Sequence, residues 1–374
     1  MQVPFVDLKA QYLALKSEID AGIFRVLDHG HYIMGPEVKE CEEKLAQFTG
    51  AKHALVCSNG SEALMMALMA LGLKAGDEII TTSFSFIATI EMPVVLGIKP
   101  VLVDIDLESY NIDPDLIENA ITEKTRAIMP VSLYGLPADF ERINAIAKKH
   151  NLFVIEDGAQ SFGALYQGRR SCHLSEIGCT SFFPAKPLGC FGDGGAVFTD
   201  DDALAKAMAS IRVHGSLERR YFHDRVGLNG RLDSMQCAVL SAKMARYPWE
   251  LSARERIAQK YNEAFRELKS FGVRTPQVPE QSQSVWAQYT LWMPKRAQVQ
   301  KALSEKGVPT AIHYPSTMYD QPAYKDLCRL AGQIENARAA AEHVLSLPMY
   351  PDMTEQISDY VIDSVRAAVL TTLK

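Results

Sequence analysis

One lysine, Lys186, lies in a segment with few other charges and is flanked by Pro184 and Pro187. A lysine amine becomes a Schiff-base nucleophile when burial or a nearby cation lowers its pKa. The two prolines argue against a regular helix or a central strand, so we expect a loop here. A solvated surface lysine fits the same local sequence, because most lysines are exposed. The rest of the chain must decide between these interpretations.

A second group of polar residues, Ser58 to Ser61, lies between an apolar run at 53–57 and an Ala/Leu/Met-rich stretch at 61–71. The first run is typical of a short buried strand and the second of a helix. The junction therefore lies at a helix N-terminus, where free N–H groups and the helix dipole favour an anion. Serine and asparagine are also ordinary N-cap residues, and that alternative stays open.

An acidic residue, Asp157, ends the near-continuous apolar run 152–157. The residues that follow, 158–164, are mostly small and permit a ligand to approach closely. In parallel α/β sheets, ligands gather at the carboxyl ends of the strands. Aspartate at a strand end also serves as a turn or cap residue. Asp157 is thus a candidate ligand-binding carboxylate with a structural alternative.

Strand and helix patterns alternate around these residues. After two expected helices, at 8–27 and 36–50, the patterns predict strands at 77–84, 100–105, 126–131 and 152–157, with helices at 87–96 and 140–150. This alternation predicts an α/β fold with three layers, in which helices cover both faces of a mostly parallel central sheet.

The pattern changes near Ala245. A charged helix at 251–268 and a Pro/Gln/Ser-rich connector precede an expected strand at 287–294. The remaining patterns predict a strand near 310–313 and helices at 295–306, 333–346 and 354–373. We therefore expect a large domain at 1–245 and a smaller α+β C-terminal domain at 246–374.

Composition limits the class of protein. The net charge of −6 gives no indication of a nucleic-acid partner or an anionic membrane surface. The first residues lack the pattern of a secretory signal, and no apolar run has the length of a membrane span. The seven scattered cysteines contain no CxxC pair, which favours reduced thiols over disulfides or a zinc site. We expect a cytoplasmic enzyme without a metal.

Three features of the chain together match the groups that pyridoxal phosphate requires. They are the Ser58–Ser61 junction, Asp157, and Lys186 with Ser181. The cofactor's aldehyde requires a lysine, its pyridinium nitrogen a carboxylate, and its phosphate a set of N–H and hydroxyl donors. A carboxylate beside the ring nitrogen keeps the ring protonated, so that the ring withdraws electrons from the amino-acid Cα. The combination predicts a pyridoxal-phosphate enzyme.

Over essentially its whole length the chain resembles the nucleotide-sugar aminotransferases of the aspartate aminotransferase superfamily, which have pyridoxal-phosphate fold type I. The motifs that carry the resemblance include SNGSEAL at 58–64, SFSFIATIE at 83–91, VIEDGAQSFGA at 154–164, TSFFPAKPLGCFGDGGA at 180–196, GLNGRLDSMQ at 227–236 and AIHYP at 311–315. The resemblance implies that Lys186 forms the Schiff base and moves the proton between Cα and the cofactor carbon.

The resemblance also implies roles for the other motif residues. Asp157 pairs with the pyridinium nitrogen, Phe86 stacks on the ring, and Gln160 bonds the ring's 3-oxygen. The phosphate is held by three residues, Gly60, Ser61 and Ser181. Asn229 reaches the phosphate in the neighbouring subunit, which implies a homodimer with shared active sites.

Within the family, the chain looks most similar to the UDP-2-acetamido-2-deoxy-3-oxo-glucuronate 3-aminotransferases of bacterial O-antigen and surface-glycan synthesis. This implies L-glutamate as amino donor, 2-oxoglutarate and a pyridoxamine phosphate form as products of the first half-reaction, and a UDP-linked keto sugar as acceptor. A guanidinium matches the substrate's C6 carboxylate, and Arg231 is the candidate, with His313 and Tyr314 as further partners.

Two alternatives remain open at this point. One is amination of another keto nucleotide sugar, such as a dTDP-linked keto-deoxyhexose, which has no C6 carboxylate. The other is a regulatory relative that has lost turnover, against which the presence of Lys186, Asp157 and Ser181 argues. The chain departs from many relatives at Ser132, where histidine is frequent, and we expect this difference to bear on the substrate.

Overall fold

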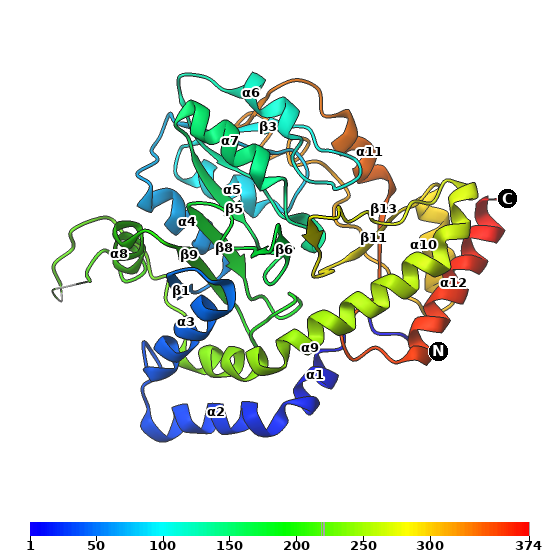
Figure 1. The fold of residues 1–374 in the computed structure, drawn as a ribbon, viewed down its shortest axis with the longest axis horizontal. Coiled ribbons are helices and arrows are strands. Elements are labelled where there is room, and N and C mark those ends of the chain that lie inside the picture. The colour runs from blue at the N-terminus through cyan, green and yellow to red at the C-terminus, as the bar shows by residue number, and fades with distance from the viewer. Residues whose placement is uncertain (218, 220, 374) are drawn as a thin grey trace.

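The computed structural model describes residues 1–374 except 218, 220 and 374. Its centre is an eight-stranded sheet (Figure 1). The strands lie in the order β1 (His53–Cys57), β9 (Gly195–Thr199), β8 (Ile177–Ser181), β5 (Phe153–Asp157), β4 (Thr125–Met129), β2 (Glu78–Thr82), β3 (Lys99–Val103) and β12 (Arg329–Leu330). Every pairing is parallel except the two that β9 makes with β1 and β8. The mostly parallel sheet expected from the sequence is confirmed.

Helices cover both faces because consecutive strand residues point in opposite directions. Ile79 and Ile155 pack in one core with α4 (Gly60–Ala70), α5 (Ala88–Val95) and α8 (Asp202–Ile211). Their neighbours Ile80 and Val154 pack on the other face, with α6 (Ile117–Ala120) and α7 (Phe140–His150). On that same face, α3 (Pro36–Thr49) and α9 (Ser234–Phe265) pack in one core with β1 and β9. These are the three layers of the predicted fold.

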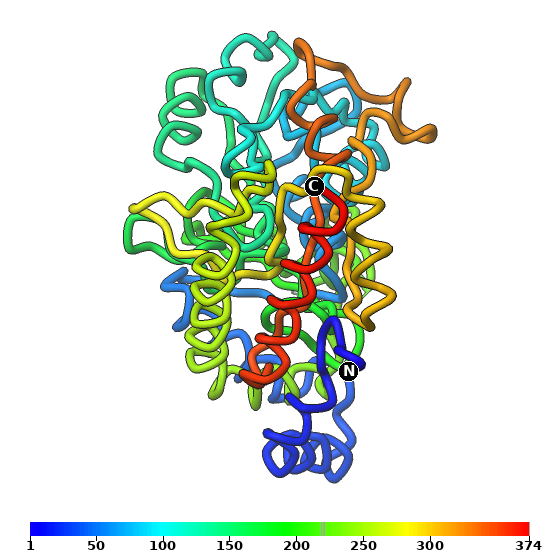
Figure 2. Tube along the Cα trace, turned by 90° about the vertical axis from the view of Figure 1, so that its right-hand side faces the viewer, coloured from blue at the N-terminus to red at the C-terminus, as the bar shows by residue number. Residues whose placement is uncertain are grey.

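The helix α9 joins this sheet to a second core and is 32 residues long. Figure 1 shows it running from below β1 and β8 to the side of α10 (Arg296–Glu305) and α12 (Glu355–Leu373). Figure 2 shows α12 between α9 and α10, with the N-terminal segment beside it. The second core also contains β11 (Tyr289–Trp292) and β13 (Val344–Leu347), which pair with each other. The expected domain division after residue 245 falls inside α9.

The remaining elements are short or peripheral. β12 pairs with β3 of the large sheet, and α11 (Glu335–His343) packs against the same part of the molecule. A small three-stranded sheet contains β10 (Ser282–Gln283), β6 (Leu165–Tyr166) and β7 (Arg169–Arg170). Three 3-10 helices complete the elements of the described residues: η1 (Pro114–Leu116), η2 (Leu133–Gly135) and η3 (Arg266–Phe271). In the described part of the chain, no helix is long and apolar enough to cross a membrane.

Four expected elements are wrong in detail. The helix at 251–268 is not a separate helix but the second part of α9, and its last residues belong to η3. The helix at 8–27 is two helices, α1 (Leu8–Ala14) and α2 (Lys16–His29), because Leu15 leaves helical geometry and packs with Ile19 and Val239. The strand near 310–313 is only one bridge, between Ala311 and Ser346. The helix at 333–346 ends at His343, because the next residues pair with β11 as β13 and are buried in the core. In this last case tertiary pairing overrides the local helical pattern.

Candidate active site

The strand ends bring three candidate residues to one edge of the sheet. Asp157, the last residue of β5, pairs with Cys179 of the parallel strand β8. Ser181, the last residue of β8, pairs with Gly195 of β9, and Gly195 in turn pairs with Cys57 at the end of β1. The turn that carries Lys186 connects β8 to β9. As expected for an α/β sheet, the polar residues gather where the parallel strands end.

Asp157 is a buried carboxylate with neutral partners. Its Oδ2 accepts a hydrogen bond from the Thr89 hydroxyl at 2.8 Å, and its Oδ1 accepts one from the Ala159 N–H at 3.2 Å. Burial raises the pKa of Asp157, while these two donors and the charge of Lys186 act in the opposite direction. No residue in the described chain forms an ion pair with it. The site thus holds a carboxylate that a bound cation would stabilise.

Lys186 lies in a tight turn rather than in a helix or strand, as the flanking prolines predicted. Its N–H donates to the Phe183 carbonyl at 2.8 Å. Burial lowers the pKa of the Lys186 amine to about 8, and the Asp157 charge opposes this shift. A larger fraction of this amine is therefore neutral near pH 7 than for a solvated lysine, which suits a nucleophile and a proton carrier.

The start of α4 forms a close contact with the end of β8. A Cβ added to Gly60 would lie 2.7 Å from the Ser181 Cβ, so only glycine fits without movement. The Asn59 side chain caps the helix by accepting from the Glu62 N–H at 2.8 Å. The Ser181 hydroxyl and the first N–H groups of α4 thus meet in a small space, and Ser61 adds a second hydroxyl in the first turn. This donor set fits a phosphate group.

Aromatic and amide side chains lie beside the carboxylate. The Phe86 ring is 54% exposed and its centroid lies 6.1 Å from that of Tyr314. The Gln160 amide is fixed at both ends, because Oε1 accepts from the Tyr134 N–H at 2.8 Å and Nε2 donates to the Tyr314 hydroxyl at 3.0 Å. The second hydrogen on Nε2 leaves Gln160 one further donor.

His313 joins this group from the C-terminal part of the chain. Its Nδ1 lies 2.9 Å from the Ser346 hydroxyl. Burial, with the nearby Lys186 charge, lowers the pKa of His313 to about 4. The imidazole is therefore neutral at physiological pH and offers hydrogen bonds instead of a positive charge.

Asn229 and Arg231 lie beside the start of α4. The residue between them, Gly230, accepts a hydrogen bond at its carbonyl from the Ser58 N–H at 3.1 Å. The Asn229 side chain is exposed. Arg231 is half-buried, and its buried Nε has no hydrogen-bond partner among the described residues. The structure thus brings both residues to the same edge of the sheet without joining their side chains to the Lys186 group.

Sequence reasoning assigned no role to Thr89, Tyr134 or Lys243. Tyr134 supports the site twice, because its N–H binds Gln160 and its hydroxyl binds the His313 carbonyl. Lys243 of α9 is 1% exposed, donates to the Gly189 carbonyl at 2.6 Å and lies over the Phe191 ring. Thr89 lies inside the motif SFSFIATIE, whereas a buried lysine in a long helix gives no signal of its own.

Ser132 does not point toward the group around Lys186. Its hydroxyl donates to Glu156 Oε1 at 3.2 Å, and Ser171 and the Cys172 N–H also donate to the same carboxyl group. Ser132 and Glu156 are fully buried, and burial raises the pKa of Glu156 to about 7. The Ser132 hydroxyl thus contacts Glu156, the residue before Asp157, and no contact of Ser132 within the described chain bears on the substrate as expected from the sequence.

Comparisons with known proteins identify the family. The model of the DegT/DnrJ/EryC1/StrS aminotransferase family matches residues 14–366. The chain is also 52% identical, over 349 residues, to the UDP-2-acetamido-2-deoxy-3-oxo-D-glucuronate aminotransferase of Pseudomonas aeruginosa, covering 93% of this chain and 95% of that one. The chain belongs to the DegT/DnrJ/EryC1/StrS aminotransferase family. The resemblance found in the motifs is confirmed.

Two solved structures share the fold of this chain, and one of them holds a bound cofactor. A family member from Brucella abortus is 40% identical with a TM-score of 0.95, covering 98% of this chain and 99% of that chain. NtdA of Bacillus subtilis, solved with the bound cofactor PMP, is 30% identical with a TM-score of 0.92. The match covers 99% of this chain and 85% of that chain. The cofactor of this aminotransferase is pyridoxal phosphate, and the amine, carboxylate and donor cluster described above fit it.

Proposed function

We propose that this aminotransferase moves the amino group of L-glutamate to C3 of UDP-2-acetamido-2-deoxy-3-oxo-D-glucuronate. The observation that carries this proposal is the buried Arg231 Nε, which has no partner in the described chain and lies beside the start of α4. An unsatisfied buried donor on a guanidinium suits a carboxylate ligand. The name of the Pseudomonas aeruginosa relative supports the same substrate.

The chemical roles are assigned to the clustered residues. Pyridoxal phosphate, when bound, supplies an aldehyde and an electron-withdrawing ring. Lys186 provides the amine and carries the proton at its Nζ, for which its lowered pKa suits it. Asp157 holds the proton on the ring nitrogen through its negative charge. Gln160 would donate to the ring oxygen with its free amide hydrogen, and Phe86 would contact the ring.

The phosphate is assigned to the start of α4. Gly60 permits close approach of the backbone, and the hydroxyls of Ser61 and Ser181 donate. The exposed Asn229 is assigned to the cofactor phosphate of a second subunit. This arrangement fixes one end of the cofactor while Lys186 acts at the other.

We assign Arg231 as the positively charged partner of the sugar carboxylate. His313 is a neutral hydrogen-bonding partner because its pKa is lowered to about 4. Tyr314 is a hydroxyl donor, since burial raises its pKa well above the usual range. A substrate without the carboxylate would leave the Arg231 charge without a partner. The enzyme should therefore prefer the uronate over a neutral sugar.

Substitution of Arg231 tests the substrate. Arg231→Gln should raise KM for the uronate by roughly 10- to 100-fold, because a charged hydrogen bond contributes about 1.5–3 kcal/mol. The rate of the glutamate half-reaction should stay within about twofold of the wild-type rate. Arg231→Lys keeps the charge without the bidentate geometry, so its KM for the uronate should lie between those of the wild type and Arg231→Gln. Equal losses in both half-reactions would assign Arg231 to cofactor binding or structure and would reject the proposal.

A homodimer with shared sites is part of the same proposal. Large apolar side chains are exposed near the site, on α2 and in the segment between α2 and α3, including Phe183, Phe191, Phe24 and Ile33. A second copy of the chain would cover such a surface, and a twofold interface would place each Asn229 at its neighbour's cofactor.

Mixed subunits test this sharing. Lys186→Ala and Asn229→Ala dimers should each be impaired. In mixed dimers one site combines an intact Lys186 with an intact Asn229, so mixing should restore roughly a quarter of wild-type activity. Absence of restoration, despite mixed dimers detected by mass spectrometry, would exclude the shared site. The proposed enzyme is cytoplasmic and serves O-antigen or surface-glycan synthesis, and neither nucleic acid nor membrane is among its proposed partners.

A further inference from the structure

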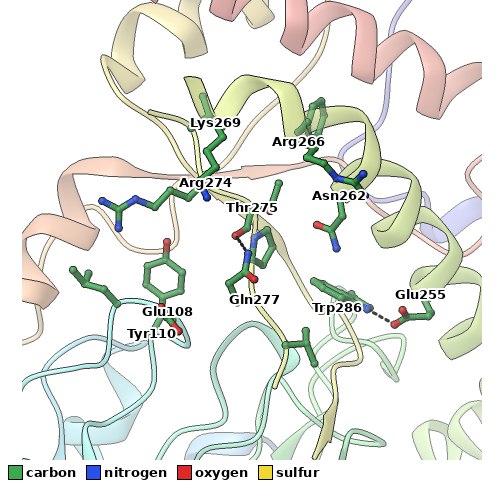
Figure 3. A pocket seen from close by; sticks show the side chains of 15 residues that line it. Glu108, Tyr110, Glu255, Asn262, Arg266, Lys269, Arg274, Thr275, Gln277 and Trp286 are labelled. Atoms are coloured by element: carbon green, nitrogen blue, oxygen red, sulfur yellow. Dashed lines mark hydrogen bonds between the residues drawn. The ribbon is translucent and has the colours of Figure 1, made fainter. Parts of the chain in front are cut away.

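A separate cavity of about 740 Å³ lies where η3 and the segment 273–278 face the segment 107–110 of the large domain (Figure 3). Its lining shares no residue with the proposed active site. Its volume is within the range of small-molecule sites, roughly 300–1,000 Å³. The walls come from α9, η3, the segments 107–110 and 273–278, and Trp286 before β11, so the cavity lies between the two cores of the molecule.

Three cationic side chains, Arg266, Lys269 and Arg274, line this cavity. Figure 3 shows all three above Tyr110 and Trp286 in that view. None of the three forms an ion pair within the described part of the chain, although the protein carries a net charge of −6. Arg274 lies 4.7 Å from the centroid of the Trp292 ring, which fixes its guanidinium without neutralising it.

Two carboxylates also line the cavity and oppose an anion. Glu255 accepts from Trp286 Nε1 at 2.6 Å and from Gln259 Nε2 at 2.9 Å, so its charge is partly satisfied by these donors. Glu108 is exposed at the edge, next to Tyr110 in Figure 3. The three cations therefore exceed the carboxylates by one charge. This balance favours a ligand with a concentrated negative charge and polar groups elsewhere.

Neutral hydrogen-bonding groups in the cavity can bind the polar, uncharged part of such a ligand. Asn262 accepts at Oδ1 from the Tyr289 hydroxyl at 2.7 Å, which fixes the amide so that its NH₂ remains a donor. Gln277 donates to the Thr275 carbonyl at 3.1 Å and keeps its amide oxygen as an acceptor. Sugar or base hydroxyl, carbonyl and N–H groups match this set. Arginine and lysine together are the usual partners of phosphate.

We propose that this cavity is a second binding site, which takes a small phosphate-bearing ligand of the nucleoside diphosphate class. Its phosphates contact Arg266, Lys269 and Arg274, and its polar remainder contacts Asn262 and Gln277. This proposal is independent of the sugar assigned to the active site.

The floor of the cavity also adjoins the active site. The Tyr110 ring lies 5.6 Å from the Tyr134 ring, and the Tyr134 N–H binds Gln160. A ligand against Tyr110 is thus connected to Gln160 through the ring of Tyr110 and the ring and backbone N–H of Tyr134. If a ligand in the cavity changes affinity at the active site, substrate must change its affinity in the cavity by the same factor, which gives a direct measure of any coupling.

Calorimetry on the cofactor-loaded enzyme tests the site with UDP, inorganic pyrophosphate and uridine as probes. UDP isotherms are fitted with two sites, because the active site is assigned a UDP-linked sugar, and the second of these sites is the one compared between variants. The triple variant Arg266→Gln/Lys269→Gln/Arg274→Gln should weaken pyrophosphate and UDP binding by at least about tenfold at low salt. Glu108→Gln should act in the opposite direction and tighten both, because it removes a repulsive charge. KM for the sugar substrate should stay unchanged in the triple variant, because none of the three replaced side chains is among the active-site residues.

The control removes the same charge elsewhere. Lys9, Lys148 and Lys301 are exposed and outside the cavity, so changing all three to glutamine alters the net charge equally. This control should bind pyrophosphate as the wild type does. Equal weakening in both triple variants would show a general charge effect and overturn the proposal. Wild-type affinity in the cavity variant, or binding of uridine as tight as that of UDP, would also overturn it.

Discussion

The Thr89 hydroxyl donates to Asp157 Oδ2 at 2.8 Å, and both side chains are buried where β5 ends. This contact supplies the only side-chain hydrogen bond to Asp157 in the described chain. Because Asp157 is assigned to the ring nitrogen, Thr89 fixes the orientation of the group that controls the ring. Its effect on the reaction is therefore indirect but measurable.

Thr89→Val keeps the side-chain shape and removes this donor. A lost hydrogen bond to a charged group costs about 1.5–3 kcal/mol, so we expect the glutamate half-reaction to slow by roughly 10- to 100-fold. Stopped-flow absorbance measures that rate. Ser85→Ala is the control, because Ser85 contacts Thr89 at 3.2 Å but not Asp157. An unchanged rate in Thr89→Val would show that the contact has no function.

The pH dependence of cofactor loading follows from Lys186. Because the pKa of Lys186 is lowered to about 8, the fraction of neutral amine increases as the pH rises through 8. The rate at which the cofactor-free protein binds the cofactor should therefore rise with pH and level off above that value. Asp157 raises this pKa, so Asp157→Asn should move the midpoint to lower pH. A midpoint near the ordinary lysine value, about 10.4, would contradict the proposed burial of the amine.

The contact between Gly60 and Ser181 gives a paired test. Gly60→Ala places a Cβ 2.7 Å from the Ser181 Cβ and should weaken cofactor binding by at least about tenfold. Ser181→Gly removes the atom that the new methyl group would meet. Adding Gly60→Ala to Ser181→Gly should therefore cost much less than adding it to the wild type, as measured by equilibrium dialysis. Equal losses in both backgrounds would place the effect in the helix backbone.

Lys243 predicts a pH-dependent stability. Burial lowers its pKa to about 8, whereas the unfolded side chain keeps the ordinary value near 10.4. Between these values the unfolded state binds more protons, so the stability contributed by Lys243 rises with pH. Relative to Lys243→Met, the wild type should gain about 2 kcal/mol between pH 7 and 9.5. The shift of Lys186 is common to both proteins and cancels in this difference, which urea unfolding measures. A constant difference across this range would mean that Lys243 titrates normally.

Much of the fold follows from local sequence. The helix 140–150 and the strand 53–57 have the bounds that their apolar patterns predicted, because each buries one face in the nearest layer. The helix expected over 333–346 ends early because β11, distant in sequence, pairs with residues 344–347. Such pairing leaves no signal in a local window.

In the candidate site, too, local sequence indicates some residues and only the fold reveals others. Lys186, Asp157 and Ser181 could be predicted because their residue types in chain order match one cofactor. The contacts that support them could not be predicted. Thr89 reaches Asp157 across 68 residues of sequence, and Lys243 reaches Gly189 across 54. Only the folded sheet brings these residues together.

The most direct test of the proposed function is the second half-reaction. The enzyme, first converted to its pyridoxamine form with L-glutamate, is mixed with UDP-linked 3-oxo sugars that carry or lack the C6 carboxylate, and the visible cofactor absorbance is followed. We predict rapid return of the pyridoxal spectrum with the uronate and at least about tenfold slower return with the neutral sugar. Equal rates with both sugars, or a faster reaction with a dTDP-linked keto-deoxyhexose, would contradict the assignment of the uronate. Failure of glutamate to convert the cofactor at all would contradict the proposed amino donor.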